Sequence, residues 1–237
     1  MFTLFFVSPE ELNHEQIRLT GVQAHHARSV LRVQKREMIR LADGVGHWIE
    51  GEVTEITKDS FTVQVAERGA DKISKTKIAV AQALLKGDNQ KAALDQLVQA
   101  GVDGILPWRA ERSIGAQDKS EKWHEVVIAA ARQSRRSLIP KLIPMTNLNG
   151  LLFACENFDV VIALHESAIN SLSSATQISD AKNLLIIIGP EGGLSDFELD
   201  QFATGGIPLV KLGDSVIRAD LAGVIAIGAI RVLTEEW

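Results

Sequence analysis

The sequence predicts an α/β protein whose larger, C-terminal part holds a mainly parallel β-sheet, preceded by a small β-rich domain. From residue 78 onward, short apolar runs alternate with segments of helical periodicity, which is typical of parallel sheets covered by helices on both faces. Before residue 68, strand-like segments are separated by turn signals such as Asp43-Gly44, which indicates a separate β-rich arrangement.

Length and composition fit a globular protein and exclude several classes. The 237 residues are 46% hydrophobic and 23% charged, with a net charge of −5, which excludes a disordered or fibrous chain. The longest apolar stretch, 221–230, contains two glycines and is far shorter than the ~20 residues of a membrane span. A single cysteine, Cys155, excludes an intrachain disulfide and fits a reducing compartment. We therefore expect a cytoplasmic protein that does not enter the membrane.

The N-terminal elements are expected to form a small β-barrel with one helix laid across it. Between the first two strands, Val22, His26 and Val33 recur at helical spacing, which predicts the helix over 20–32. The polar segment 68–77 contains a glycine and is predicted to be the linker. The strands are predicted over 2–7, 38–42, 47–56 and 60–65.

The C-terminal elements are expected to alternate between strand and helix. A further helix is predicted to begin at Ser195-Asp196-Phe197-Glu198. Strands are predicted over 78–83, 104–107, 160–164, 184–188 and 208–212, and helices over 87–100, 120–134 and 219–233.

Polar or glycine-rich segments follow three of the predicted strands. They are His165-Glu166-Ser167, Gly189-Pro190-Glu191-Gly192-Gly193 and Gly213-Asp214-Ser215. Because the carboxyl ends of parallel strands lie at one edge of a sheet, these segments are expected to form one pocket. The glycines let the backbone approach a ligand closely. Their spacing does not match the dinucleotide or P-loop patterns, so those two ligand classes are excluded.

Two local basic patches stand out on this acidic chain. Five basic residues and one acid lie between Arg28 and Arg40, and four basic residues and no acid lie between Arg132 and Lys141. Such patches can supply the phosphate contacts that position a polynucleotide. A solvated helix face is the alternative for either patch.

Together these motifs resemble the RsmE family of SPOUT methyltransferases, over nearly the whole chain. The resemblance is carried by Phe5-Phe6-Val7, by His25-His26 with Val30-Leu31-Arg32, by Leu85-Lys86-Gly87-Asp88, by Gln133-Ser134-Arg135-Arg136, by Gly189 to Gly193 and by Leu212 to Ala222. It implies a PUA-like RNA-binding domain over 1–70 and, over 74–237, a methyltransferase domain with a trefoil knot. It further implies a homodimer that uses S-adenosylmethionine to methylate N3 of a uridine in small-subunit (16S) ribosomal RNA, within an assembling 30S particle.

The resemblance assigns the predicted pocket to the cofactor. S-adenosylmethionine carries no phosphate, so a glycine loop without a P-loop lysine suits its adenosine. No metal is expected, because His25 and His26 have no cysteine or acidic partner at ligand spacing. The expected cofactor-binding residues are Leu164, His165, Glu166, Ile188, Gly189, Pro190, Glu191, Gly192, Gly193, Leu212, Gly213 and Ile217.

Arg218, Asp220 and Glu191 are the candidate catalytic residues. N3 of uracil bears a proton and has no available lone pair, so methyl transfer requires loss of that proton. A cation that stabilises charge on O2 and O4 would help, and Arg218 is the candidate. A carboxylate that receives the proton would also help, and Asp220 and Glu191 are the candidates. Three alternatives stay open: a salt bridge of Arg218 to Asp214 or Asp220, a helix N-terminal role for Asp220, and a loop-holding role for Glu191.

The chain departs from the family pattern beside these candidates. The family usually reads Arg, then Thr or a similar residue, then Glu, Thr and Ala, where this chain reads Arg218-Ala219-Asp220-Leu221-Ala222, and it commonly has Glu at the position of Gln99. The alternatives are therefore an RNA-binding protein of this fold without turnover, or a SPOUT methyltransferase acting on another RNA. The small residues of helix 219–233 predict very close packing by a threaded strand or a partner subunit, with ordinary helix-on-sheet packing as the alternative.

Cationic and polar residues at strand and helix ends are expected to contact RNA. For Arg136, a favourable interaction with a helix C-terminus is the alternative. The expected RNA-binding residues are His25, Arg28, Arg32, Lys35, Arg109, Arg112, Gln133, Arg135 and Arg136.

Overall fold

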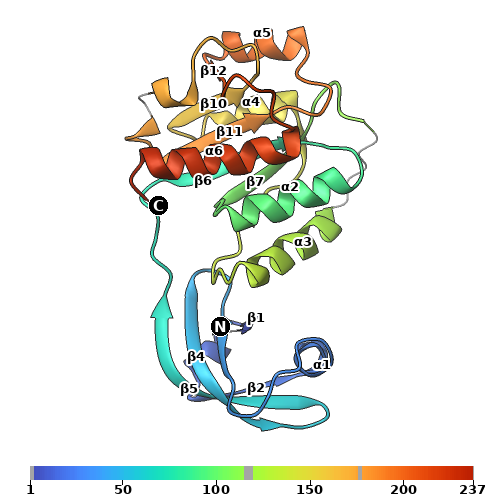
Figure 1. Cartoon of the computed structure of the whole chain (residues 1–237), viewed down its shortest axis with the longest axis vertical. Coiled ribbons are helices and arrows are strands. Elements are labelled where there is room, and N and C mark those ends of the chain that lie inside the picture. The colour runs from blue at the N-terminus through green and yellow to red at the C-terminus, as the bar shows by residue number, and fades with distance from the viewer. Residues whose placement is uncertain (1–2, 115–119, 176–177, 237) are drawn as a thin grey trace. The chain divides into compact units, whose positions relative to one another are not determined.

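The computed structural model describes residues 3–114, 120–175 and 178–236. The chain divides into two compact units (Figure 1): residues 1–73 with 131–139, and residues 74–130 with 140–237. The segment 131–139 thus groups with the N-terminal unit, whereas the sequence placed it in the C-terminal domain. The domain ranges 1–70 and 74–237 stay a prediction.

The N-terminal unit is built on a five-stranded sheet with the order β1-β3-β4-β5-β2. The strands β1 and β3 are parallel, and the other neighbours are antiparallel. Two register shifts interrupt the pairing of β4 with β5, and both long strands curve in Figure 1. The strands are β1 (Thr3–Phe6), β2 (Gln16–Thr20), β3 (Met38–Ala42), β4 (His47–Ile56) and β5 (Ser60–Ala70), with a 3-10 turn over Glu11–Asn13.

Three details of this unit differ from the sequence prediction. The helix α1 (Gly21–Ser29) buries Ala24 and Ala27, while Val22 is 86% exposed, so the predicted apolar stripe was wrong. The helix is short, and its alanine face is the one that lies on the sheet. The strand β2 was not predicted, because it contains only two apolar residues. The strand β5 continues to Ala70, which shortens the connection between the units to residues 71–76.

The C-terminal unit contains a seven-stranded sheet whose recorded pairings are all parallel. The strand order is β12-β10-β11-β6-β7-β8, and β9 pairs with the far end of β7. The strands are β6 (Lys77–Ala83), β7 (Gly104–Arg109), β8 (Lys141–Leu142), β9 (Thr146–Asn147), β10 (Val160–Leu164), β11 (Asn183–Ile188) and β12 (Leu209–Val210). The helices are α2 (Asp88–Gln99), α3 (Ser120–Gln133), α4 (Leu148–Cys155), α5 (Asp196–Thr204) and α6 (Ala219–Leu233), with a 3-10 turn over Leu172–Ser174.

Helices cover both faces of this sheet, as predicted. Leu185 and Ile187 of β11 share one apolar cluster with Leu151 of α4 and Phe202 of α5. On the other face, α2 and α6 lie side by side across β6 in Figure 1. The α/β class is therefore confirmed, while the trefoil knot stays a prediction. No helix in the described part of the chain is long and apolar enough to cross a membrane.

The glycine at position 223 shows how closely α6 packs. A Cβ atom there would lie 2.5 Å from Leu97 Cδ2 and 2.9 Å from Ile188 Cδ1, so no larger residue fits without movement. At this position, ordinary packing against α2 and the sheet accounts for the glycine.

A buried arginine joins the end of α6 to the start of β6. Arg231 is 5% exposed, and its Nη1 donates to the Thr76 carbonyl at 2.7 Å and to Glu236 Oε2 at 2.8 Å. Its Nη2 donates to Asp103 Oδ2 at 3.2 Å. The Glu236 carboxylate accepts in turn from the backbone amides of Lys75 and Thr76. The two ends of the C-terminal unit are therefore fastened together.

Candidate functional site

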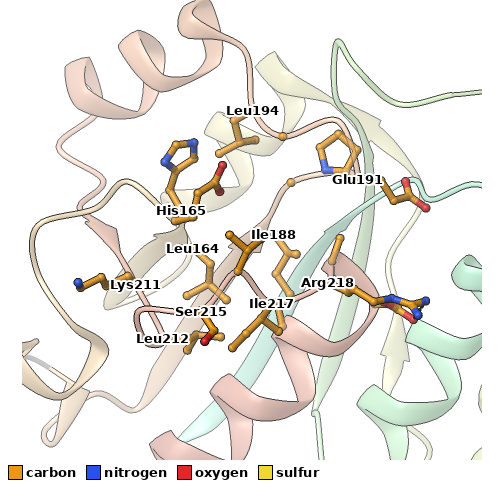
Figure 2. A pocket seen from close by; sticks show the side chains of 18 of the residues that line it. Leu164, His165, Ile188, Glu191, Leu194, Lys211, Leu212, Ser215, Ile217 and Arg218 are labelled. Carbon is orange, nitrogen blue, oxygen red and sulfur yellow. Dashed lines mark hydrogen bonds and ion pairs between the residues drawn. The ribbon is translucent and has the colours of Figure 1, made fainter.

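A cavity of about 310 Å³ lies at the carboxyl ends of β10, β11 and β12. In Figure 2, apolar side chains such as Leu164, Ile188 and Ile217 gather at its centre, with Glu191 and Arg218 on one side and His165 on the other. The cavity brings together the predicted cofactor residues, except that Gly192 does not line it, and the three predicted catalytic residues. The parallel pairing of these strands is what places their three loops at one edge of the sheet.

The Gly-rich loop is fixed at its entry and along its length. The indole Nε1 of the fully buried Trp108 donates to the Ile188 carbonyl at 3.1 Å. Arg112 Nη1 donates to the carbonyls of Gly192 at 3.2 Å and Leu194 at 3.1 Å. Gly193 has a φ of +72° and donates its amide to the Pro190 carbonyl at 2.9 Å, a turn that favours glycine.

The exit of the loop is fixed by a capping box at the start of α5, where the sequence predicted a helix. Ser195 Oγ accepts from the Glu198 amide at 3.3 Å, and Glu198 Oε2 accepts from the Ser195 amide at 2.8 Å. The other oxygen of this buried carboxylate accepts from the Glu111 amide at 2.8 Å. Both ends of the loop are thus held by buried hydrogen bonds.

Glu191 ties the same loop to the N-terminal end of α2. Its Oε1 accepts from the Lys86 amide at 3.1 Å and from Asn89 Nδ2 at 3.0 Å. Partial burial opposes ionisation and is the largest single influence on the pKa of Glu191. The hydrogen bonds from Asn89 and from backbone amides, together with the charge of Lys86, outweigh it and hold that pKa below its ordinary value. Glu191 is therefore ionised at neutral pH and is a weak base.

Arg218 and Asp220 form a bidentate ion pair at the N-terminus of α6. Arg218 Nε donates to Asp220 Oδ1 at 3.0 Å, and Nη2 donates to Oδ2 at 2.8 Å. The Asp220 side chain is 8% exposed and the Arg218 side chain 67%. Nη2 also donates to Asn89 Oδ1 at 3.4 Å. The structure therefore contains one of the open alternatives, the salt bridge from Arg218 to Asp220; Asp214 pairs instead with Lys211.

His165 is oriented by its own loop. Its Nδ1 lies 2.8 Å from Ser167 Oγ and accepts from the Ser167 amide at 3.3 Å. This bonding assigns the proton of the neutral ring to Nε2, so His165 offers a donor rather than an acceptor.

The third loop is held loosely. Within the described ranges, residues 213–217 make no backbone hydrogen bond, and Val216 is 79% exposed although it lines the cavity. Its one side-chain ion pair among the described residues joins Lys211 and Asp214, at 2.8 Å.

The predicted RNA-binding residues are placed on both units. In the N-terminal unit, His25, Arg28, Arg32 and Lys35 are exposed on α1 and the turn after it. In the segment 131–139, Gln133 and Arg135 are exposed and Arg136 is half-buried. In the C-terminal unit, Arg109 is exposed at the end of β7, whereas Arg112 binds the Gly-rich loop.

Asn89, which bonds to both Glu191 and Arg218, is one of the site residues that the sequence did not predict. The others line the cavity but were not among the predicted cofactor-binding or catalytic residues, namely Leu194, Val210, Lys211, Ser215, Val216, Ala219 and Ala222. Asn89 follows the quoted segment Leu85-Lys86-Gly87-Asp88 directly, which is the signal that could have found it. Gln99, the other departure from the family, bonds to Asp95 at 2.8 Å on the exposed end of α2 and does not line the cavity. In the part of the chain that the structure describes, no group of three or more His, Cys, Asp or Glu side chains is placed to hold a metal ion.

Comparison with known proteins defines the class of this chain. Residues 72–231 match the RNA methyltransferase domain, and residues 19–66 match the RNA methyltransferase PUA domain. Because the first match covers most of the chain and includes the strand-end cavity, this chain is an RNA methyltransferase.

Similarity over the full length then gives the family. The ribosomal RNA small subunit methyltransferase E of Mycobacterium bovis is 30% identical over 92% of this chain and 86% of the relative. The protein of that name from Bacillus subtilis is 28% identical over 95% of each chain. The crystal structure of the Neisseria gonorrhoeae protein of that name, bound to S-adenosylmethionine, has a TM-score of 0.88 and 25% identity over 98% of each chain. This chain belongs to the ribosomal RNA small subunit methyltransferase E family, and the resemblance seen in the sequence is confirmed.

The residues of the cavity fit S-adenosylmethionine. Among the described residues, the cavity lining contains one lysine and one arginine, Lys211 and Arg218, and each is paired with an aspartate, so these residues form no cluster of free cations for a phosphate. A Cβ at Gly189 would lie 3.0 Å from the Leu194 side chain, so glycine at this position allows the loop to pack closely against itself. The apolar centre suits an adenine ring, and the exposed backbone groups suit a ribose.

Proposed function

We propose that this protein transfers the methyl group of S-adenosylmethionine to N3 of a uridine in small-subunit ribosomal RNA, in the cytoplasm and within an assembling 30S particle. One observation carries the proposal: the preformed Gly-rich loop and the Arg218–Asp220 pair line the same cavity. The chain matches its small-subunit rRNA methyltransferase relatives over nearly its whole length.

In this proposal, the residues at the ends of β10, β11 and β12 hold the cofactor. Leu164, Ile188 and Ile217 supply the apolar walls, and residues 189–193 supply backbone groups. When bound, the cofactor supplies an electrophilic methyl group. The fixed loop holds its binding site in one shape, which lowers the entropic cost of binding.

Arg218 is the proposed stabiliser of charge on the uracil ring. Two of its donor nitrogens, Nε and Nη2, face Asp220, which leaves Nη1 for O2 or O4 of the base. Both oxygens of Asp220 are occupied by this pair, and Glu191 is held ionised by its hydrogen bonds. These contacts support a positioning role for both carboxylates over the proton-accepting role that the sequence suggested. The N3 proton is then lost to solvent as charge builds on the ring.

The exposed cations of the N-terminal unit are the proposed RNA contacts. Arg32 and Arg135 have φ values of 54° and 56°, a left-handed conformation that costs a side-chain-bearing residue about 1–2 kcal/mol. Glycine would avoid this cost, so an arginine at such a position favours a function for its side chain. The match to an RNA methyltransferase PUA domain supports the same role.

An exposed apolar stripe on α6 supports the proposed homodimer. Leu221, Ile225 and Val232 lie at helical spacing on one side of α6 and are 37%, 43% and 63% exposed. Large apolar side chains repeated on one helix face mark an interface more often than a solvated surface.

Two measurements test the proposed activity. Calorimetry should detect S-adenosylmethionine binding by the purified protein, and mass spectrometry of 16S rRNA from a deletion strain should show the loss of one N3-methyluridine, restored by the wild-type gene. An unchanged methylation map with intact RNA binding would instead identify the second candidate, an RNA-binding protein without turnover. That candidate is motivated by Ala219, which lines the cavity where the family usually has threonine. Loss of a methyl group from a different RNA would identify the third candidate.

A further inference from the structure

Asn89 is the one described side chain that bonds to both the Gly-rich loop and Arg218. Its Nδ2 donates to Glu191 Oε1 at 3.0 Å, and its Oδ1 accepts from Arg218 Nη2 at 3.4 Å. The orientation of the amide is determined by these neighbours, because only an NH₂ group can face the carboxylate and only the oxygen can face the guanidinium. The three residues come from α2, the loop after β11 and the start of α6, which are far apart in the sequence.

The two contacts of Asn89 differ in how replaceable they are. Glu191 keeps the Lys86 amide as a second donor, and the Gly-rich loop keeps its bonds from Trp108 and Arg112. Arg218 has only Asp220 besides Asn89 as a hydrogen-bond partner among the described residues, and its side chain is 67% exposed. Loss of Asn89 therefore leaves the loop in place but removes the contact that fixes the guanidinium of Arg218 relative to that loop.

We propose that Asn89 is a positioning residue that fixes the guanidinium of Arg218 relative to the cofactor loop. The role rests on the proposed function, in which Arg218 stabilises charge on the base. An asparagine is suited to it, since its amide offers one donor and one acceptor at the same time, and the contacts here need one of each. An aspartate would still accept from Arg218 but would place a second carboxylate against Glu191.

Two variants of Asn89 should therefore fail in different ways. Asn89→Ala is expected to lower kcat about tenfold, because Arg218 loses its orientation, and to change the cofactor Kd less than about threefold. Asn89→Asp is expected to keep kcat within about threefold of wild type and to weaken cofactor binding about fivefold, through repulsion of Glu191. Asn157→Ala is the matched control and should change neither quantity, because Asn157 is an exposed asparagine whose side chain bonds to the end of α4, at 3.2 Å.

The experiment uses the full-length protein, 30S subunits from the deletion strain, and calorimetry with S-adenosylmethionine. In an Arg218→Ala background, Asn89→Ala should add no further loss of kcat; an additive loss would show that Asn89 does not act through Arg218 and would overturn the inference. If the wild-type protein fails to methylate the subunits, the proposed function is wrong. Calorimetry then still decides on the loop contact, since an Asn89→Asp protein that binds the cofactor as tightly as wild type contradicts it.

Discussion

Two walls of the same cavity are held in very different ways. The Gly-rich wall, residues 188–194, accepts hydrogen bonds from Trp108, Arg112, Asn89 and the amide of Lys86, and it ends in a buried capping box. The second wall, residues 213–217, has no backbone hydrogen bond within the described ranges and a 79%-exposed valine on its surface. A wall that is bonded in advance lowers the entropic cost of binding, whereas a loosely held wall takes its shape when a ligand arrives. We therefore expect the cofactor to be recognised mainly by the first wall, and the second wall to take its final shape afterwards.

The largest expected effect comes from Arg218, which directly follows the second wall. Arg218→Ala should lower kcat about 100- to 1000-fold, the usual loss when a donor to developing charge is removed, with little change in cofactor Kd. The kcat of Arg218→Lys should lie between those of the wild type and the alanine variant, because lysine keeps the charge but loses the bidentate contact with Asp220. The measurement is single-turnover methyl transfer to 30S subunits. Full activity of the alanine variant would remove Arg218 from the mechanism.

A glycine-to-alanine change should distort the fixed wall. Gly193 has a φ of +72°, which costs alanine about 1–2 kcal/mol, so Gly193→Ala should weaken cofactor binding about tenfold by calorimetry. Gly206→Ala is the matched control: its φ is +69° and nothing lies within 4 Å of a Cβ there, so it bears the same strain outside the cavity. Both variants should lose similar thermal stability, and only Gly193→Ala should lose affinity. Equal affinities would show that the shape of the fixed wall does not matter for binding.

Arg112 should have a smaller effect that separates two roles. If it tethers the fixed wall, Arg112→Ala removes two hydrogen bonds to backbone carbonyls and should weaken cofactor binding about fivefold in the absence of RNA. Arg109→Ala, an exposed neighbour at the end of β7, should leave that affinity unchanged. A normal cofactor Kd for Arg112→Ala, together with weaker RNA binding, would show that Arg112 has the predicted role in RNA binding and no role in holding the Gly-rich wall.

Hydrogen exchange should sharpen the comparison without any substitution. The amides of residues 213–217 should exchange fast in the free protein and slow severalfold when S-adenosylmethionine is added. The amide of Gly193, which already bonds to the Pro190 carbonyl, should change less. Equal changes in the two walls would mean that the fixed wall also rearranges on binding.

Much of the fold follows from local sequence patterns. The strand 160–164 and the helix 219–233 have the predicted bounds, because each is a largely apolar segment flanked by polar residues. The helix α4 escaped notice, since it has only eight residues and contains Gly150, although Asn147 caps it by accepting from the Gly150 amide at 3.0 Å. The two-residue strands β8 and β9 are too short to show any periodicity, and only tertiary pairing with β7 defines them.

The sequence predicted which loops form the site but did not predict the hydrogen bonds that hold them. Parallel strands place their carboxyl ends together, so three separate segments of sequence indicated one cavity. The partners of Glu191 are more than 100 residues away from it along the chain, and no local pattern pairs them. Likewise, the charge of Arg112 led to a prediction of RNA binding. Its bonds to the carbonyls of Gly192 and Leu194 could not be predicted, because no local sequence pattern pairs these residues.

The hydrogen bonds of Arg231 and Glu236 hold the two ends of the C-terminal unit next to each other. Because Glu236 bonds to the amides of Lys75 and Thr76, the methyltransferase unit begins and ends at one point in space. Adjoining ends are the condition under which a domain tolerates circular permutation. A permuted gene could join residue 236 to residue 74 through a short linker and place the new termini in a surface loop. The encoded chain should therefore still form the cavity, although the parts of the cavity would be synthesised in a different order.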